Sequence, residues 1–465
     1  MQAQSSAFYD LAVIGGGVIG CAMARRFALA GAKVVLIEKG SDILSGASKA
    51  NSAILHTGFD ATPDSLELQC IRAGHEEYLE IAPRMNLPVL ETGALVVAWN
   101  KNDIEKLDGI VAQAHGNGVA DVRRIAAEEI RRREPGLEPG LLGGVLVPRE
   151  YLIDPWSAPL AYIQQAMAHG AEVMRNAEVT GGAFDGRSWR VETTGGAVTA
   201  THVVNCAGLF GDRIEFLLLS DASFEIRPRK GQFVVFDKAA AGLLGSILLP
   251  VPSERTKGIV ITRTVFGNLL VGPTAEEQED RDHAATDTET LGILIEAAIS
   301  RIPALADMPV TATYAGLRPA SEQKYYRIRH EPGRNWITAG GIRSTGLSSA
   351  LGLAQHVFRL WNGEAGLTPP SRISWPGLPN LAEDRVRDWQ LPDHGEIVCH
   401  CELVTRREIE AAFCSPLPPG DFGGLKRRTR TCMGRCQGFY CIGRLAELTK
   451  DRLAVPLTVG GADER

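Results

Sequence analysis

Apolar runs of two kinds alternate along the first forty residues. Residues 9–14 form an apolar run of the strand type, and a helical stretch follows through Ala30. A second strand-type run covers residues 33–37 and ends at Glu38. The order strand, helix, strand predicts an α/β unit at the start of the chain.

The middle of the chain interleaves strand and helix patterns without an obvious motif. Residues 85–150 and 226–320 contain apolar runs such as Gly93–Trp99 and Gly231–Phe236, which predict a sheet. A proline-rich stretch without periodicity follows Trp361 and predicts an extended linker.

Length and composition describe a large globular protein. With 465 residues the chain exceeds what a single core supports, so we expect two or three domains. Its hydrophobic content of 45% and its 50 glycines are typical of an α/β protein with many tight turns. The net charge of -6 gives no reason to expect nucleic acid or an anionic membrane surface as a partner.

The sequence shows no export or membrane signal. The first ten residues lack a charged region followed by an apolar stretch, and no apolar run reaches the ~18 residues of a membrane span. We therefore expect a cytoplasmic protein that meets the inner face of a membrane only through a partner. In such a reducing compartment, nine cysteines argue against a disulfide framework.

Three glycines stand in GxGxxG register between the first strand and the helix: Gly15, Gly17 and Gly20. The first permits a tight turn, the second lets the backbone approach a pyrophosphate, and the third lets the helix pack on the strand. The helix N-terminus offers amide donors to the phosphates, and Glu38 can accept the ribose hydroxyls. The unit therefore predicts a dinucleotide site.

FAD is the dinucleotide that the sequence favours. The acid at the end of the second strand, Glu38, repels a 2′-phosphate and so disfavours NADP. A flavoprotein that takes hydride from NAD(P)H normally needs a second nucleotide fold, and only one such unit is visible. We therefore expect the substrate to reduce a bound FAD directly.

Four cysteines near the C-terminus are the second chemical signal. They form a CxC pair, Cys399 and Cys401, and a CxxxxC pair, Cys436 and Cys441. Thiolates at such spacings suit a soft metal, and four cysteines are the usual complement of one iron-sulfur cluster. Spacing alone leaves a zinc site equally open.

Further short motifs stand at residues 45–58, 203–208, 314–319 and 340–347. With the glycine motif they resemble the D-amino-acid-oxidase-like family of FAD enzymes, which includes glycerol-3-phosphate dehydrogenases and L-2-hydroxyglutarate oxidases. The resemblance covers residues 8–360 and implies a Rossmann-type FAD-binding domain with an interleaved antiparallel-sheet substrate domain. It also implies that one set of residues lies along the FAD: Ser45, Ser48, Val179, Ala207, Gly208, Gly341 and Gly346.

The same resemblance places the loops of His56 and Arg318 on the substrate side of the flavin ring. A neutral imidazole there would accept the hydroxyl proton of an alcohol while its C–H hydride leaves. The guanidinium of Arg318 suits capture of a carboxylate or phosphate, with Arg343 as a second candidate. On the residues alone, the first reading of His56 is a loop histidine that caps a turn, and Arg318 is equally a partner of a structural carboxylate.

One position departs from the glycerol-3-phosphate dehydrogenase pattern. Those enzymes tend to carry a lysine directly after the double glycine that corresponds to Gly340 and Gly341, where it helps to hold the phosphate. This chain has Ile342 there. Its GGIRSTGL motif is more similar to the hydroxyglutarate-oxidase branch, so a hydroxy acid gains weight over a polyol phosphate.

The C-terminal segment has CxC followed by MGxCQGxxC. It resembles the ferredoxin-like domain of bacterioferritin-associated ferredoxin, in the form appended to the anaerobic glycerol-3-phosphate dehydrogenase large subunit. The resemblance implies a small, mainly helical domain in which the four cysteines ligate a [2Fe-2S] cluster, with Cys432 open as a replacement for Cys441. The basic run at residues 426–430 reads either as a solvated face or as a patch that docks an acidic redox partner.

These expectations describe an α/β plus α+β protein. We expect an FAD-dependent dehydrogenase that oxidises a small anionic secondary alcohol, either a 2-hydroxy acid or a polyol phosphate like glycerol 3-phosphate. Hydride passes to flavin N5, and electrons leave through the cluster to an acceptor protein, a partner subunit or a quinone-linked partner rather than O2. Two alternatives stay open, namely an amine, opine or amino-acid dehydrogenase of the same fold and a zinc-stabilised assembly subunit.

The expected parts follow the chain in an interleaved order. They are an FAD-binding domain at 8–85, 151–225 and 321–360, a substrate domain at 86–150 and 226–320, a linker at 361–396, and a [2Fe-2S]-binding domain at 397–455.

Overall fold

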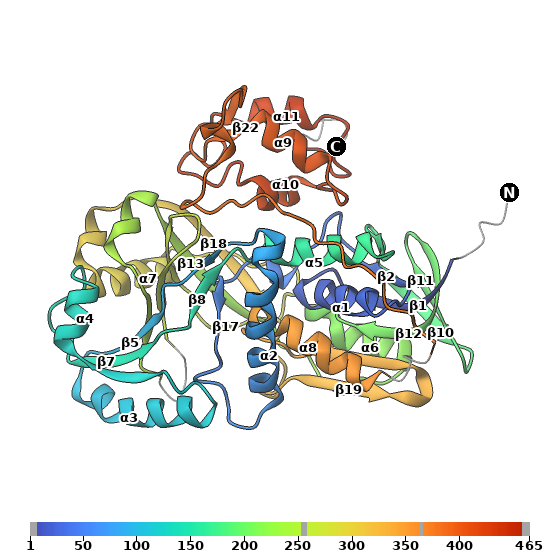
Figure 1. Ribbon diagram of the computed structural model, residues 1–465, viewed down its shortest axis with the longest axis horizontal. Coiled ribbons are helices and arrows are strands. Elements are labelled where there is room, and N and C mark those ends of the chain that lie inside the picture. Colours follow the sequence, from blue (N-terminus) through green and yellow to red (C-terminus); the bar gives the residue numbers. More distant parts are fainter. Residues whose placement is uncertain (1–6, 253–257, 362–365, 458–465) are drawn as a thin grey trace.

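Two large sheets, each assembled from distant segments of the chain, organise the protein (Figure 1). The computed structural model describes residues 7–252, 258–361 and 366–457. Within these ranges the first sheet has eight strands and the second has nine. No helix in the same ranges has the length and apolar character needed to cross a membrane.

The first sheet holds the opening unit predicted from the sequence. Its strands are β1 (Phe8–Ile14), β2 (Val34–Ile37), β9 (Glu172–Met174), β10 (Val179–Phe184), β11 (Trp189–Thr193), β12 (Gly196–Asn205), β19 (Arg327–Glu331) and β20 (Trp336–Gly340). They lie in the order β10-β11-β12-β1-β2-β9, with β20 beside β12 and β19 beside β20. β1 runs parallel to β2 and to β12, so their carboxyl ends share one edge, where ligands of such sheets bind.

Helices pack closely around this sheet. They are α1 (Val18–Leu29), α2 (Leu66–Ile81), α5 (Ser157–Ala168), α6 (Gly211–Leu219) and α8 (Gly346–Leu360). α1 contacts α5 and α8, and α2 contacts α8. α2 and α8 lie so close together that a Cβ at Gly74 would be 2.1 Å from the carbonyl oxygen of Ser348. Position 74 therefore requires glycine.

The second sheet draws its strands from the two middle segments. They are β5 (Ala94–Ala98), β6 (Arg123–Ala126), β7 (Gly143–Val147), β13 (Arg229–Phe236), β14 (Ile247–Pro250), β15 (Val260–Arg263), β16 (Leu269–Gly272), β17 (Glu276–Glu277) and β18 (Val310–Arg318). Its order is β17-β13-β16-β15-β14-β5-β7-β6, with β18 beside β13. The helices α3 (Lys101–Gly116), α4 (Ala127–Arg133) and α7 (Thr288–Arg301) complete this part.

The prediction of an antiparallel sheet is wrong at one pair of strands. β14 runs parallel to β5, with Leu248 opposite Leu95. The two strands belong to different segments of the chain, and no hairpin joins them. Their relative direction is therefore set by a long connection and not by a tight turn.

A three-stranded sheet joins the two large parts. Its strands are β3 (Ile54–Leu55), β4 (Val89–Leu90) and β8 (Tyr151–Ile153), with β8 in the centre. β3 and β8 pair antiparallel, with Leu55 opposite Tyr151. This pairing brings His56, the residue after β3, close to Glu150, the residue before β8.

The stretch between Trp361 and the C-terminal module runs over the surface of both parts. Its residues 362–365 lie outside the described residues, and the rest contains no strand and no α-helix. The amide of Leu378 donates to the carbonyl of Met85 at 3.0 Å, and that of Glu383 donates to Val265 at 2.9 Å.

The C-terminal module lies against the rest of the molecule, at the top of Figure 1. It comprises β21 (Ile397–Cys399), β22 (Val404–Thr405), α9 (Arg406–Phe413), α10 (Phe422–Thr429) and α11 (Ile442–Thr449). Val398, Ile409, Leu425 and Leu445 belong to an apolar cluster of its own. The described elements are mainly helical, and the domain boundaries given above stay a prediction.

Candidate active site

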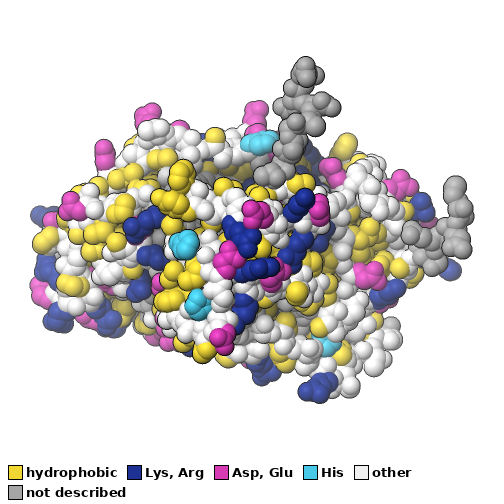
Figure 2. Space-filling model, turned by 90° about the horizontal axis from the view of Figure 1, so that it is seen from above, with side chains coloured by type: hydrophobic (Ala, Val, Ile, Leu, Met, Phe, Trp, Pro, Cys, Tyr) yellow, Lys and Arg dark blue, Asp and Glu magenta, His cyan; other side chains and the backbone are white. Residues whose placement is uncertain are grey.

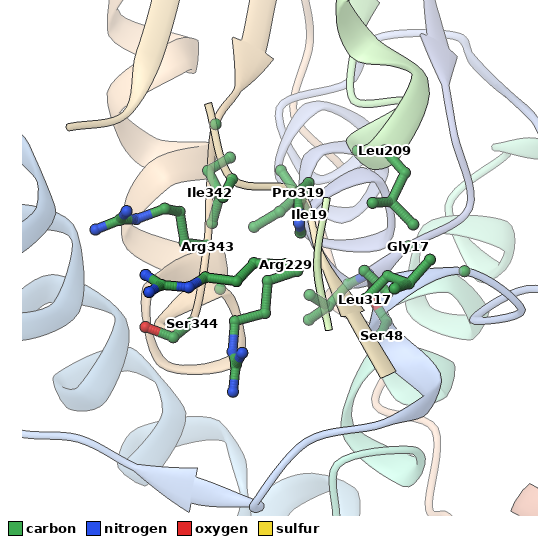
Figure 3. Close-up of a pocket in the computed structure, with 18 of the residues that line it drawn as sticks. Gly17, Ile19, Ser48, Leu209, Arg229, Leu317, Pro319, Ile342, Arg343 and Ser344 are labelled. Atoms are coloured by element: carbon green, nitrogen blue, oxygen red, sulfur yellow. Dashed lines mark hydrogen bonds between the residues drawn. The ribbon is translucent and has the colours of Figure 1, made fainter. Parts of the chain in front are cut away.

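A cavity of about 1650 Å³ is lined by residues of both large sheets and of the loops between them. The glycine motif lines one side of it. In Figure 3, Arg229, Arg343 and Ser344 lie on one side of the pocket, whereas Gly17 and Ser48 lie on the opposite side. The cavity therefore has a small-residue end and a cationic end.

The turn after β1 has no room for side chains. Gly15 has a φ of +108°, and a Cβ there would lie 2.5 Å from the carbonyl oxygen of Cys206. A Cβ at Gly20 would lie 1.9 Å from the carbonyl oxygen of Gly15. At Gly17 a Cβ would meet only the hydroxyl of Ser48, at 3.2 Å, and this glycine faces the cavity.

Glu38 is held in place by the backbone. Its Oε2 accepts from the amide of Gly16 at 2.6 Å, and its Oε1 accepts from the amide of Gly40 at 2.7 Å. Burial raises the pKa of Glu38, and the two amides act in the opposite direction. Each carboxylate oxygen keeps acceptor capacity for a further hydroxyl donor.

Ten of the eleven residues predicted to bind the cofactor line this cavity, and Gly20 lies behind it under Gly15. Ser48 accepts a hydrogen bond from the amide of Val18, at the start of α1, at 3.0 Å. The ten lining residues are Gly15, Gly17, Glu38, Ser45, Ser48, Val179, Ala207, Gly208, Gly341 and Gly346.

These features fit an FAD. The turn leaves space for a pyrophosphate, the first residues of α1, Val18 and Ile19, line the cavity, and Glu38 is fixed beside it. The volume of about 1650 Å³ leaves room for a small substrate as well.

His56 and Glu150 meet because β3 pairs with β8. The Nδ1 of His56 lies 2.7 Å from Oε2 of Glu150, whose other oxygen accepts from the amide of Thr57 at 2.6 Å and from its hydroxyl at 2.7 Å. Glu150 is fully buried, and His56 lines the cavity. With Glu150 as the acceptor of this contact, a neutral imidazole would carry its proton on Nδ1 and leave Nε2 as the basic nitrogen.

Sequence reasoning missed Glu150. It lies far from His56 in the chain, within an unremarkable Pro-Arg-Glu-Tyr turn. Only the register of the small sheet brings the two residues together, so no local signal in the sequence indicates this contact.

Arg318 carries a donor that no described residue satisfies. Its Nη2 donates to the carbonyl of Thr274 at 3.1 Å, whereas its Nη1 is buried without a hydrogen-bond partner among the described residues. Burial lowers the pKa of Arg318 to about 10, helped by the neighbouring charges of Arg229 and Arg343. Such a group favours an anionic ligand, which would supply the missing acceptor.

Arg229 is a second residue that sequence reasoning missed. It stands directly opposite Arg318 in the antiparallel pairing of β13 with β18. It also lines the cavity, and its Nε lies 3.2 Å from Oε1 of Glu277. The next residue, Lys230, is paired with Glu276 at 2.9 Å and does not line the cavity.

The C-terminal module brings five thiols into two contacting groups. Cys441 contacts Cys399 and lies with its sulfur 3.4 Å from that of Cys432, while Cys401 contacts Cys436. Among the described residues, no three or more Cys, His, Asp or Glu side chains are arranged to hold a metal ion. Among the described residues the four predicted ligands therefore lie as two contacting pairs, Cys399 with Cys441 and Cys401 with Cys436, and not as one set around a metal ion. The choice between Cys432 and Cys441 stays open.

The thiols differ in acidity. Burial raises the pKa of Cys399 and of Cys441 to about 11. The pKa of Cys436 is lowered, chiefly by the backbone amide of Tyr440 in the loop that follows it. An all-thiol donor set of this kind fits an iron-sulfur cluster in its chemistry.

Comparison with known proteins places this site in a family. Residues 10–360 match the family model DAO, described as FAD dependent oxidoreductase. The chain is 31% identical over 459 residues to the glycerol 3-phosphate dehydrogenase of Caloramator mitchellensis, covering 97% of this chain and 95% of that protein. It is 28% identical over 305 residues to an L-2-hydroxyglutarate dehydrogenase of Escherichia coli, covering 63% of this chain and 71% of that protein.

A solved structure shows the same fold. The dithionite-reduced L-alpha-glycerophosphate oxidase from Mycoplasma pneumoniae, with FAD bound, matches with a TM-score of 0.74 at 26% identity. The match covers 79% of this chain and 97% of that one. With the glycine turn, the fixed Glu38 and the cavity, these matches show that the chain belongs to the DAO family and is an FAD-dependent oxidoreductase.

Proposed function

We propose that this oxidoreductase oxidises the secondary alcohol of a small phosphate ester of the glycerol 3-phosphate type. The observation that carries the proposal is the cationic end of the cavity, where Arg229, Arg318 and Arg343 all face the same space. The relative that matches nearly the whole chain is a glycerol 3-phosphate dehydrogenase.

A phosphate suits this cluster better than a single carboxylate. A phosphate monoester carries up to two charges and three acceptor oxygens, and three guanidinium groups can bind them together. The Nη1 of Arg318, which has no hydrogen-bond partner within the described ranges, would gain an acceptor on binding, and this removes the cost of a buried unsatisfied donor.

The chain supplies a base at the same cavity. A bound FAD would supply the acceptor for the hydride of the substrate carbon. His56 takes the hydroxyl proton at Nε2, so that the alcohol becomes a ketone as the C–H and O–H bonds break. Glu150 keeps the proton on Nδ1 and stabilises the imidazolium that forms.

We further propose that the C-terminal thiols hold a [2Fe-2S] cluster. Its ligands are Cys399, Cys401 and Cys436 together with Cys441 or Cys432, and it supplies a one-electron route to an acceptor protein or a quinone-linked partner. The all-thiol donor set supports this proposal. Iron and acid-labile sulfide in the purified protein would support it, whereas zinc without sulfide would favour the zinc-stabilised assembly subunit.

A 2-hydroxy acid is the second candidate substrate. Ile342 stands where a lysine is expected in glycerol-3-phosphate dehydrogenases, and it is buried at the cavity wall. The L-2-hydroxyglutarate dehydrogenase relative and the carboxylate-binding capacity of arginine favour this alternative.

Steady-state kinetics with a one-electron dye distinguish the candidates. We expect kcat/KM for glycerol 3-phosphate to exceed that for glycerol and for L-2-hydroxyglutarate by at least about a hundredfold, since phosphate binding is used to position the reacting carbon. If kcat/KM is larger for L-2-hydroxyglutarate than for glycerol 3-phosphate, the hydroxy acid is favoured. If kcat/KM is largest for proline or an opine, the amine alternative is favoured.

A further inference from the structure

One loop is shared between the FAD cavity and the C-terminal module. Residues 39–48 follow β2, and their inner side lines the cavity at Gly40, Ser45 and Ser48. The amide of Leu44 donates to the carbonyl of Gly16 at 3.0 Å, which ties this loop to the glycine turn. A shift of the 39–48 loop would therefore change the cofactor site.

On its outer side the loop carries a buried charge. Asp42 is fully buried, and it accepts hydrogen bonds from both terminal nitrogens of Arg428 in α10, at 2.6 and 2.9 Å. The amide of Gly420 donates to the same carboxylate at 3.3 Å, and Arg175 lies 3.7 Å away. The Arg428 side chain is only 6% exposed, so the ion pair is sealed from solvent.

The contact extends over three consecutive loop residues. Ser41 donates to Asp421 at 2.6 Å on one side of Asp42, and the carbonyl of Ile43 accepts from Arg427 at 3.1 Å on the other. A Cβ at Gly420 would lie 1.8 Å from the carbonyl oxygen of Ser41, so the two backbones touch. The module thus holds the loop at both ends of this tripeptide.

The basic run of the sequence is thereby explained. Arg428 and Arg430 are buried, the latter paired with Glu402 at 2.8 Å, so these two form neither a solvated face nor a docking patch. Figure 2, which looks down on the molecule from the side of the module, shows acidic and basic side chains intermixed on this face.

We propose that the C-terminal module clamps the FAD-binding loop, and that Asp42 and Arg428 are the positioning residues of this clamp. Breaking one partner of a buried ion pair leaves an uncompensated charge, which favours separation of the loop from the module. FAD affinity then depends on a module that does not itself line the cavity. This inference rests on FAD binding alone and needs neither the proposed substrate nor the cluster.

The coupling is reciprocal, because two linked equilibria shift each other by the same factor. FAD binding should therefore protect α10 from opening. Hydrogen exchange of the α10 amides, measured in apoprotein with and without FAD, is expected to slow on FAD addition. Exchange of α10 that does not respond to FAD would overturn the proposal.

The direct experiment compares FAD affinities of full-length variants by flavin fluorescence, without substrate. Asp42→Asn and Arg428→Lys are each expected to weaken FAD binding by roughly tenfold or more, and the double variant by less than the product of the two. Arg444→Gln is the matched control, because it removes an exposed ion pair with Glu396 elsewhere on the module. Its FAD affinity should equal that of the wild type.

A milder variant tests the clamp even if the Asp42–Arg428 ion pair proves to be needed for folding. Ser41→Ala removes only the hydrogen bond to Asp421 and is expected to weaken FAD binding by about threefold. Circular dichroism and thermal unfolding of the apoprotein establish that each variant is folded. Folded variants, Ser41→Ala included, that bind FAD as tightly as the wild type would overturn the clamp, whatever the substrate proves to be.

Discussion

In the proposed reaction, the base His56 depends on the buried carboxylate of Glu150. Glu150→Gln keeps the size of the side chain and removes its charge, so the imidazolium formed during oxidation loses its stabilisation. We expect flavin reduction by substrate to slow by roughly 10²-fold with little change in substrate affinity. Anaerobic stopped-flow measurement checks this, with His56→Gln as the reference for loss of the base. An unchanged rate in Glu150→Gln would exclude the role given to Glu150.

If Arg318 holds the substrate anion as proposed, anion binding should depend on pH. Its pKa is lowered to about 10, chiefly by burial. Below that pH the guanidinium is protonated and binds an anion, and as pH rises through about 10 the charge is lost, so affinity should fall. Inorganic phosphate, titrated as a ligand that perturbs the flavin spectrum, provides the measurement. Affinity that stays flat across this range would show that Arg318 does not hold the anion.

Among individual residues, those in local motifs could be predicted from the sequence. His56 and Arg318 stand in short motifs, and both line the cavity. Glu150 and Arg229 could not be predicted, because each reaches the site only through strand pairing, β3 with β8 and β13 with β18. Their roles depend on the register of the sheets and not on their neighbours in sequence.

In the turn between β1 and α1, one glycine should matter for the stability of the apoprotein and another for FAD binding. Gly20→Ala places a methyl group 1.9 Å from the Gly15 carbonyl, so we expect the apoprotein to lose roughly 1–3 kcal/mol of stability. Gly17→Ala meets only Ser48 Oγ at 3.2 Å, so the apoprotein should unfold near the wild-type temperature while FAD binding is lost. Thermal unfolding and FAD titration of both variants test this. Equal stability of the two apoproteins would contradict the assignment.

Elements formed by local patterns were predictable, and those formed by long connections were not. The unit of β1, α1 and β2 follows from apolar runs and glycine spacing within forty residues. The parallel pairing of β5 with β14 depends on how the chain returns to the sheet after passing through the other part. The burial of Arg428 likewise depends on a contact with Asp42 across the molecule.

For the molecule as a whole, flavin reduction should be separable from electron transfer through the proposed cluster. Cys401→Ser is expected to abolish iron and labile sulfide and to stop transfer to a one-electron acceptor, while substrate still reduces the flavin at the wild-type rate. Cys414→Ser changes an exposed thiol of the same module outside the two thiol groups and is the matched control. Loss of iron in the control, or its retention in Cys401→Ser, would contradict the ligand assignment.

The reaction itself can be observed in a single anaerobic turnover. Glycerol 3-phosphate added to the oxidised holoprotein should bleach the flavin absorbance and form one equivalent of the ketone phosphate, with no oxygen and no added dye. A flavin that stays oxidised with glycerol 3-phosphate, but is bleached by L-2-hydroxyglutarate or an amino acid, would contradict the proposed substrate.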